Sequence, residues 1–249
     1  MLYKTPTKII SLVPSLTELL VDLVLDENIV GITKFCVHPL DIRKSKLIVG
    51  GTKNINFKKI TELQPDIIIC NKEENTKEIV EKCKKIAPTH TSDIKNIKDT
   101  LELISMYGEI FSVEEKSKSI QKQLSILLTD FKVFLENKKT RKVVYIIWKK
   151  PWMVAANDTF INYMLALNKF DNIYKDLNRY PEINLEDLQK KKDLELVFLS
   201  SEPYPFKEKD LNKLQHKFAN CNLQLVNGEY FSWYGTRLLK AFTYFKSLH

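Results

Sequence analysis

The sequence is poor in glycine and lacks the motifs of the common catalytic folds. It has 6 glycines in 249 residues, too few for the glycine-rich loops that cradle phosphates. It contains no GxGxxG, P-loop, HExxH or GxSxG pattern, and no motif places two carboxylates on a common site. These absences argue against nucleotide-dependent, zinc-protease and serine-hydrolase chemistry, and we expect a binding protein, not an enzyme.

Cysteine pairs and long apolar runs are also absent. The sequence has 4 cysteines, which are Cys36, Cys70, Cys83 and Cys221. They form no CxxC motif, so nothing requires an oxidising compartment. No run approaches the roughly 18 apolar residues of a membrane helix, and Pro14, Glu18 and Asp22 interrupt the apolar start as a signal peptide would not allow. As written, the chain is expected to be cytoplasmic, or periplasmic if an export signal has been removed.

The positive charge of the chain is spread out. The formal net charge is +8, yet the lysines scatter along the sequence in short clusters such as residues 190–192. A protein that reads nucleic acid usually gathers its basic residues on one face of a recognisable module. We therefore predict a solvated lysine surface, no nucleic-acid partner and no membrane insertion, with some long-range attraction for anionic ligands.

Strands and helices alternate in the first part of the chain. Apolar runs at residues 8–13, 29–32, 46–49 and 67–70 predict strands. Helices are predicted after the first, third and fourth of them, and a loop at residues 34–39 after the second. Ser15 and Glu18 match a capping box that would begin the first helix. Because parallel strands need a crossover helix, this order predicts an N-terminal α/β lobe with a parallel sheet over residues 1–98.

The middle of the chain is helical, and a second α/β lobe follows. Residues 113–136 predict one helix of about 36 Å at 1.5 Å per residue, within a bridging segment over residues 99–140. Strand patterns at residues 142–148 and 194–200 then begin a C-terminal lobe over residues 141–249. The predicted fold is α/β: two lobes, each with a central parallel sheet flanked by helices, joined by one long helix, with a ligand cleft between them.

The order of short motifs in the first lobe resembles a known family. Residues 9–18 (IISLVPSLTE), 30–33 (VGIT), 50–51 (GG) and 63–68 (LQPDII) are similar to the class III periplasmic binding proteins of ABC importers. These helical-backbone metal receptors bind vitamin B12, haem or iron–siderophores, and the vitamin B12 binding proteins are nearest in pattern. The resemblance covers nearly the whole chain.

The resemblance implies a function and a partner. It implies a monomeric solute-binding protein that moves little on binding, requires no cofactor and holds a corrinoid, haem or ferric siderophore as its ligand. Members of the family dock to an ABC permease through an exposed glutamate on each lobe. At the second matching position Glu186 is retained, whereas the first position carries Lys58.

Aromatic and basic residues cluster where the resemblance places the cleft. Flat metal chelates need aromatic faces for stacking and a few polar anchors. The candidate ligand-binding residues are Lys34, Phe35, Cys36, His38, Trp148, Trp152, Tyr180, Phe231, Trp233, Tyr234 and Arg237. We favour the cleft for Trp152, leave Trp148 open between cleft and core, and expect residues 230–234 to form an exposed aromatic surface. Arg237 is equally consistent with an anionic-ligand contact and with a brace for the last helix.

Two further sequence features leave alternatives open. Cys36 and His38 are a candidate metal-binding pair, which would suit a cytoplasmic metal- or cofactor-handling protein or enzyme on the same fold. A third alternative is a structural or regulatory protein that no longer binds ligand. Residues 73–75 could reach the cleft, whereas Asn71 or Glu73 could instead cap the next helix.

Overall fold

The computed structural model describes residues 4–218 and 221–249. The chain divides into two compact units, each described by itself below. Unit 1 comprises Met1–Ile126 and Tyr234–Leu239, and unit 2 comprises Leu127–Trp233 and Lys240–His249. Both units are built of strands and helices in alternation, as the sequence predicts.

Unit 1 contains a five-stranded parallel sheet in the order β3-β2-β1-β4-β5. The strands are β1 (Ile9–Ser11), β2 (Ile29–Ile32), β3 (Leu47–Ile48), β4 (Ile67–Asn71) and β5 (Thr89–Ser92). The four predicted strands are confirmed. The central strands β1 and β4 are buried along their whole length, as expected for a sheet covered on both faces.

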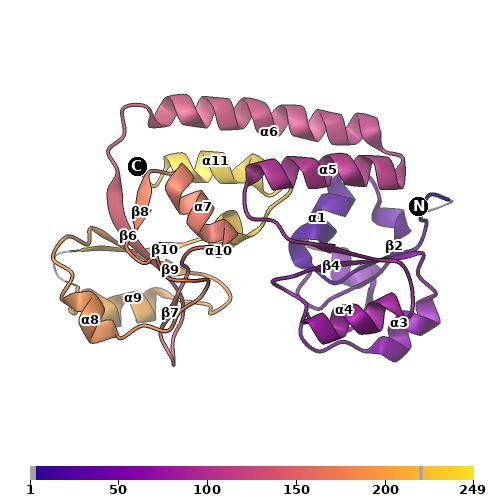
Figure 1. Cartoon of the computed structure of the whole chain (residues 1–249), viewed down its shortest axis with the longest axis horizontal. Helices are drawn as coiled ribbons and strands as arrows, with labels where there is room; N and C mark the ends of the chain where they lie inside the picture. Colours follow the sequence, from indigo (N-terminus) through magenta and orange to yellow (C-terminus); the bar gives the residue numbers. More distant parts are fainter. Residues whose placement is uncertain (1–3, 219–220) are drawn as a thin grey trace. The chain divides into compact units, whose positions relative to one another are not determined.

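Helices cover the two faces of this sheet. They are α1 (Pro14–Asp22), α2 (Ile42–Ser45), α3 (Phe57–Leu63), α4 (Lys77–Lys84) and α5 (Ile97–Phe111), with a short 3-10 turn at Asp26–Asn28. In Figure 1, α3 and α4 lie on one face of the sheet and α1 on the other. The predicted capping box is wrong: α1 begins at Pro14, so Ser15 and Glu18 lie inside the helix and are buried.

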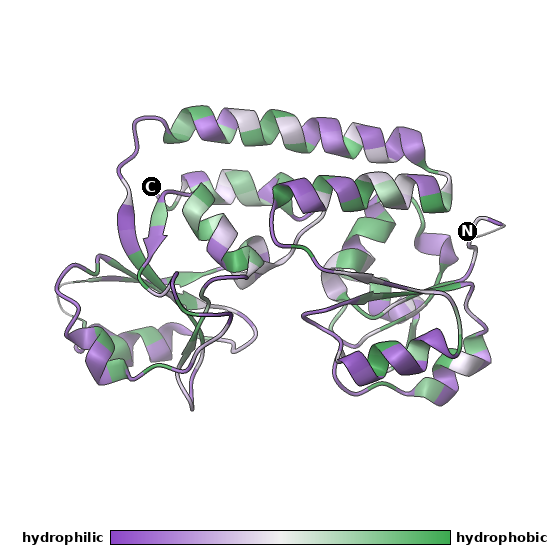
Figure 2. Cartoon of the chain, in the orientation of Figure 1, coloured by the Kyte–Doolittle hydropathy of each residue, from purple (hydrophilic) through white to green (hydrophobic). Residues whose placement is uncertain are grey.

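The core of unit 1 follows from strand alternation. Ile10 of β1 and Leu12, just after it, share a core cluster with Ile60 of α3 and Cys83 of α4, while Ser11 between them accepts a hydrogen bond from Thr17 of α1 at 2.8 Å. Figure 2 shows hydrophobic residues on one side of α4 and hydrophilic residues on the other. Such an amphipathic helix can bury one side on a sheet and keep the other in solvent.

Gly50 ends β3 in a conformation that glycine alone adopts readily. Its φ is +133°, and a Cβ atom there would lie 2.4 Å from the Asn54 carbonyl oxygen. We expect Gly50→Ala to lower the free energy of unfolding by about 1–3 kcal/mol, measured by urea denaturation. Gly51→Ala is the matched control, since the atoms nearest its Cβ would belong to flexible side chains: the Phe35 ring at 3.1 Å and Lys34 Cε at 3.4 Å. Equal losses in both variants would contradict the prediction.

The long helix predicted over residues 113–136 is confirmed as α6 (Glu114–Leu135). Its 22 residues extend about 33 Å. The predicted bridging segment at 99–140 therefore holds two helices, most of α5 and all of α6. The division between the units falls inside α6, after Ile126.

Unit 2 contains a five-stranded sheet centred on β6. Its strands are β6 (Arg141–Trp148), β7 (Met153–Val154), β8 (Phe170–Asn172), β9 (Leu196–Ser200) and β10 (Asn222–Val226). Strands β8, β9 and β10 are parallel to their neighbours, but β7 is antiparallel to the end of β6. The sheet is therefore not wholly parallel as predicted, because the short loop at Pro151 returns the chain as a hairpin.

The helices of unit 2 again cover both faces of its sheet (Figure 1). They are α7 (Phe160–Leu167), α8 (Leu185–Gln189), α9 (Glu208–Gln215), α10 (Gly228–Ser232) and α11 (Leu238–Lys246). Leu188 of α8 and Leu214 of α9 pack with Val144 and Val197 of the sheet. On the other face, Phe231 of α10 packs among aromatic rings of the sheet and α11.

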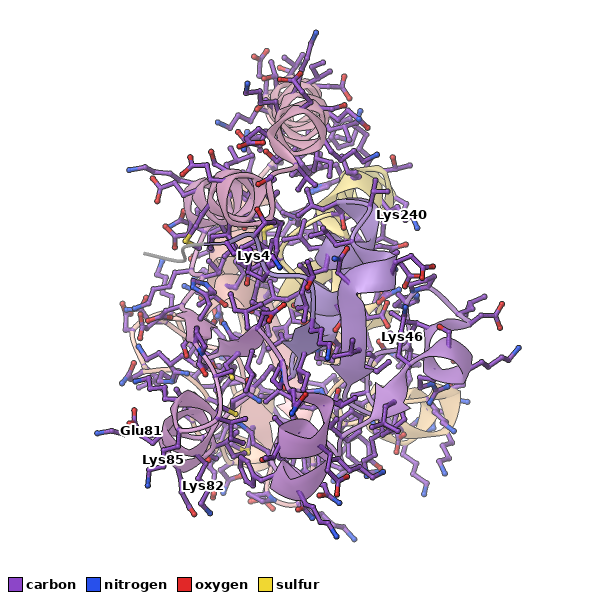
Figure 3. The ribbon with its side chains drawn as sticks, turned by 90° about the vertical axis from the view of Figure 1, so that its right-hand side faces the viewer. Lys4, Lys46, Glu81, Lys82, Lys85 and Lys240 are labelled. Carbon is purple, nitrogen blue, oxygen red and sulfur yellow. The ribbon has the colours of Figure 1, made fainter. Side chains whose placement is uncertain are left out.

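The lysines lie largely on the surface, as expected. Lys82 and Lys85 project outward from α4 beside Glu81 (Figure 3), and Lys82 pairs with Glu78 one turn away at 2.7 Å. In the part of the chain that the structure describes, no helix is both long enough and apolar enough to cross a bilayer.

Candidate ligand-binding surfaces

The predicted first-lobe residues lie at the carboxyl end of the unit 1 sheet. Lys34, Phe35, Cys36 and His38 follow directly after β2. In α/β sheets, ligands bind at the edge formed by the carboxyl ends of the strands. We call this edge of unit 1, formed by the loops that follow β1, β2, β3 and β4, the unit 1 ligand edge.

Lys34 and Phe35 form an exposed cation–aromatic pair at this edge. Phe35 is 49% exposed, and the Lys34 ammonium lies 5.1 Å from the centre of its ring. The ring lies close to Gly51, where a side chain would crowd it. An exposed aromatic face with an adjacent cation suits a flat ligand that carries negative charge.

Cys36 is buried, contrary to the expectation of a ligand-facing thiol. Its exposure is 0%, and its Sγ lies 3.1 Å from the Thr17 hydroxyl and 3.3 Å from the Thr33 hydroxyl. Burial raises the pKa of the thiol, whereas metal ligation requires a thiolate. His38 is half-buried and lies near Glu18, whose pKa its charge lowers.

The predicted metal pair gains no further ligands. Within residues 4–218 and 221–249, no group of three or more His, Cys, Asp or Glu side chains is placed to hold a metal ion. A structural metal site generally needs four ligands, and a catalytic one three.

Arg237 is held in a buried ion pair with Glu18. Its Nε donates to Glu18 Oε2 at 2.9 Å, and its Nη2 lies 2.8 Å from Glu18 Oε1, with side-chain exposures of 6% and 10%. Burial raises the pKa of Glu18 more than Arg237 lowers it. Of the two roles that the sequence allows for Arg237, this geometry supports the brace, which attaches the segment Tyr234–Leu239 to α1.

The aromatic segment at residues 230–234 is not the exposed surface that we expected. Phe231 is 0% exposed, and Trp233 and Tyr234 are also buried. The Phe231 ring lies 5.1 Å from the Tyr145 ring and 4.8 Å from the Phe245 ring. Phe231 is therefore a core residue of unit 2.

In unit 2, Trp148 is the exposed tryptophan and Trp152 the packed one. Trp148 ends β6, is 37% exposed, and meets the Tyr204 ring edge-to-face at 5.5 Å. Trp152 stacks on Phe206 at 6.2 Å and packs against the core beneath. Trp148 is thus the more exposed of the two tryptophans, and Tyr204, which the sequence analysis missed, lies beside it.

Basic residues near these rings are paired. Lys149 forms an ion pair with the buried Asp210, and its ammonium lies 4.7 Å from the Tyr204 ring centre. Tyr180 is half-buried, with the Arg179 guanidinium 5.7 Å from its ring centre. We call the pair of Trp148 and Tyr204 the unit 2 aromatic surface.

The two positions matched to permease docking are both exposed. Lys58 lies on α3 with its side chain 86% exposed and its ammonium 3.9 Å from Glu62. Glu186 lies in the first turn of α8, where its backbone N–H donates to Asn184 Oδ1 at 2.7 Å. This first turn leaves the Glu186 carboxylate at the surface.

Comparison with known proteins identifies the family. Residues 9–220 match the family model of periplasmic binding proteins. The chain belongs to the periplasmic binding protein family.

Relatives and a solved structure agree with this assignment. The uncharacterized ABC transporter substrate-binding lipoprotein YvrC of Bacillus subtilis is 27% identical over 195 residues, or 75% of this chain and 62% of that protein. The iron(3+)-hydroxamate-binding protein YxeB of the same species is 34% identical over 93 residues, or 37% of this chain and 28% of that protein. The chain thus spans less than two thirds of the length of either relative.

The likeness in fold is closer than the likeness in sequence. The crystal structure of the periplasmic vitamin B12 binding protein BtuF of Vibrio cholerae superposes with a TM-score of 0.85, covering 98% of this chain and 96% of that one at 19% identity. At this identity the likeness concerns the fold alone. By their printed names, these proteins bind a transporter substrate, an iron(3+) hydroxamate and vitamin B12, respectively.

Proposed function

We propose that this chain is a non-catalytic solute-binding protein for a bulky metal-chelate ligand, namely a corrinoid, haem or ferric siderophore. Its partner would be the permease of an ABC-type uptake system. The observation that carries the proposal is the exposed aromatic surface at the carboxyl ends of strands in each unit: Phe35 beside Lys34 in unit 1, and Trp148 beside Tyr204 in unit 2.

Aromatic faces supply the main attraction for such a ligand. Large rings bury 150–250 Å² each, and well-oriented ring pairs add about 0.5–1.5 kcal/mol. Lys34 adds a cation for acidic groups of the chelate. Docking would use Glu186 on α8, and Lys58 on α3 would alter the contact that a second glutamate makes in other family members.

Spectroscopic titration tests the proposal. Purified protein is titrated with cyanocobalamin, haemin and a ferric hydroxamate, and the visible absorption of each chelate is followed. We expect a saturable 1:1 shift with one of them, and a Kd about tenfold higher in Trp148→Ala because a stacking face is lost.

The control is Ile126→Ala, which removes an apolar side chain that is more exposed than Trp148, 58% against 37%, from α6, outside both surfaces. It should bind as the unchanged protein does. The absence of a saturable shift with all three chelates would overturn the proposed function.

A further inference from the structure

A group of exposed lysines in unit 2 has no role in the function proposed so far. Lys209, Lys213 and Lys217 recur every four residues along α9 and the turn that follows it, and all three are exposed. Residues four positions apart on a helix are neighbours at its surface. Lys191 and Lys192, which are also exposed, follow the C-cap of α8. We call these five lysines the unit 2 basic surface.

The two groups of lysines lie on one part of unit 2. Helices α8 and α9 pack on the same core and cover the same face of the sheet (Figure 1). The segments that follow the two helices also meet, because the Cys221 thiol donates to the Leu194 carbonyl oxygen at 3.1 Å. Leu194 comes two positions after Lys192, and Cys221 comes four positions after Lys217. The lysines therefore form a continuous surface.

Helix stability does not explain this arrangement. Lysine is favourable in the last turn of a helix, where it complements the helix dipole, but Lys209 lies in the first turn of α9. Like charges four positions apart, such as Lys209 and Lys213, repel each other and destabilise a helix. The arrangement is unfavourable within the free protein, and an external negative charge would relieve it.

The charge of the unit 2 basic surface is not compensated by the protein. Within residues 4–218 and 221–249, none of its five ammonium groups has a carboxylate within 4.0 Å. On α4 of unit 1, by contrast, Lys82 and Lys84 lie 2.7 and 2.8 Å from glutamate oxygens. The carboxylates of α8 and α9 that lack a lysine partner are Glu186 and Glu208. The lysines outnumber them, so the surface is positive.

The side chains around these lysines indicate the class of partner. Residues 185–218 contain no arginine, and none of their aromatic side chains is exposed. Protein interfaces depend on aromatic and arginine side chains at their centre. Proteins that bind single-stranded nucleic acid need aromatic rings for base stacking. A membrane surface with anionic headgroups requires only positive charge, and lysine supplies it as a hydrated point charge.

We propose that the unit 2 basic surface holds the protein at membranes that contain anionic phospholipids. The lysine ammonium groups are attracted to the headgroup phosphates, and this attraction falls off within a Debye length of the membrane. Such binding is peripheral, needs no inserted segment and weakens as salt is added. The inference goes beyond the proposed function and does not depend on it, because no chelate takes part.

Vesicle sedimentation tests the inference. The probes are vesicles of phosphatidylcholine and phosphatidylglycerol in equal parts, and vesicles of phosphatidylcholine alone, at low ionic strength. We expect the unchanged protein to sediment with the anionic vesicles only, and to be released by added salt. In the triple variant Lys209→Gln/Lys213→Gln/Lys217→Gln, the partition coefficient should fall about 10- to 100-fold, because three attractive charges are lost.

The matched control is the triple variant Lys82→Gln/Lys84→Gln/Lys98→Gln. It also removes three positive charges, but each of these lysines has a glutamate partner within one helical turn. Its partition coefficient should stay within about threefold of the unchanged protein, because the field of each lysine is already cancelled locally. Thermal unfolding checks that both variants are folded.

Three outcomes would overturn the inference. The first is that the unchanged protein does not bind the anionic vesicles, or binds the neutral ones equally well. The second is an equal loss in both triple variants, which would assign binding to net charge alone. The third is retention of the protein by duplex DNA without binding to vesicles, which would assign the surface to nucleic acid. Each of them leaves the chelate titration, and with it the proposed function, unaffected.

Discussion

Arg237→Ala is expected to lower the free energy of unfolding by about 3–5 kcal/mol. The substitution leaves the buried Glu18 carboxylate without the guanidinium that donates to it at 2.9 Å, and breaking a buried pair from one side carries this cost. Urea denaturation at pH 7 measures the loss. Arg179→Ala serves as the control, because Arg179 lies 3.5 Å from Asp158 in a half-exposed pair whose removal should cost at most about 1 kcal/mol.

The pH dependence of the same variant distinguishes an ion pair from simple packing. Burial already raises the pKa of Glu18, and Arg237 opposes that rise. Without Arg237 the pKa of Glu18 in the folded state rises further. Glu18 therefore takes up a proton more readily in the folded state of the variant than in its unfolded state. The difference in free energy of unfolding between the unchanged protein and Arg237→Ala should therefore become smaller as the pH falls from 7 to 5. If this difference in free energy of unfolding did not change with pH, the effect of Arg237→Ala would come from lost packing alone.

Phe231→Ala is expected to lower the free energy of unfolding by about 3–5 kcal/mol, as for other fully buried phenylalanines. The Phe231 ring is 0% exposed and lies 5.1 Å from the Tyr145 ring and 4.8 Å from the Phe245 ring. Its removal leaves a cavity in the centre of unit 2. Thermal and urea denaturation both report the loss.

Trp148→Ala is the contrasting substitution. Trp148 is a larger aromatic residue but is 37% exposed, so its removal should cost less than about 1 kcal/mol while weakening ligand binding. If Phe231→Ala weakened binding and left stability unchanged, the burial of Phe231 would not describe its role, and residues 230–234 would regain their assignment as a ligand surface.

The elements of the fold are predictable from the sequence because their signals are local. Apolar runs broken by proline and glycine indicate β1 and β4, and a regular apolar stripe indicates α6. Strand β7 escaped prediction because two residues, Met153–Val154, carry no periodicity. Its direction depends on the tight loop at Pro151 and not on the helical crossovers that govern the other strands.

The candidate site is less predictable because burial of its residues depends on distant parts of the chain. Glu18 and Arg237 are 219 positions apart. The residues around Arg237 in the sequence do not indicate which carboxylate pairs with it. Contiguous aromatics at residues 230–234 fit an exposed loop or a core filler equally well.

The division of the chain has a consequence for its synthesis. Unit 1 contains Tyr234–Leu239, although more than a hundred intervening residues belong to unit 2. When the ribosome has synthesised residues 1–126, Arg237 has not yet been made. The ion pair between Glu18 and Arg237 can therefore form only late in synthesis. Unit 1 can adopt most of its sheet early, but its last piece arrives only after nearly all of unit 2 has been made. The protein cannot be cut at one point into two complete halves.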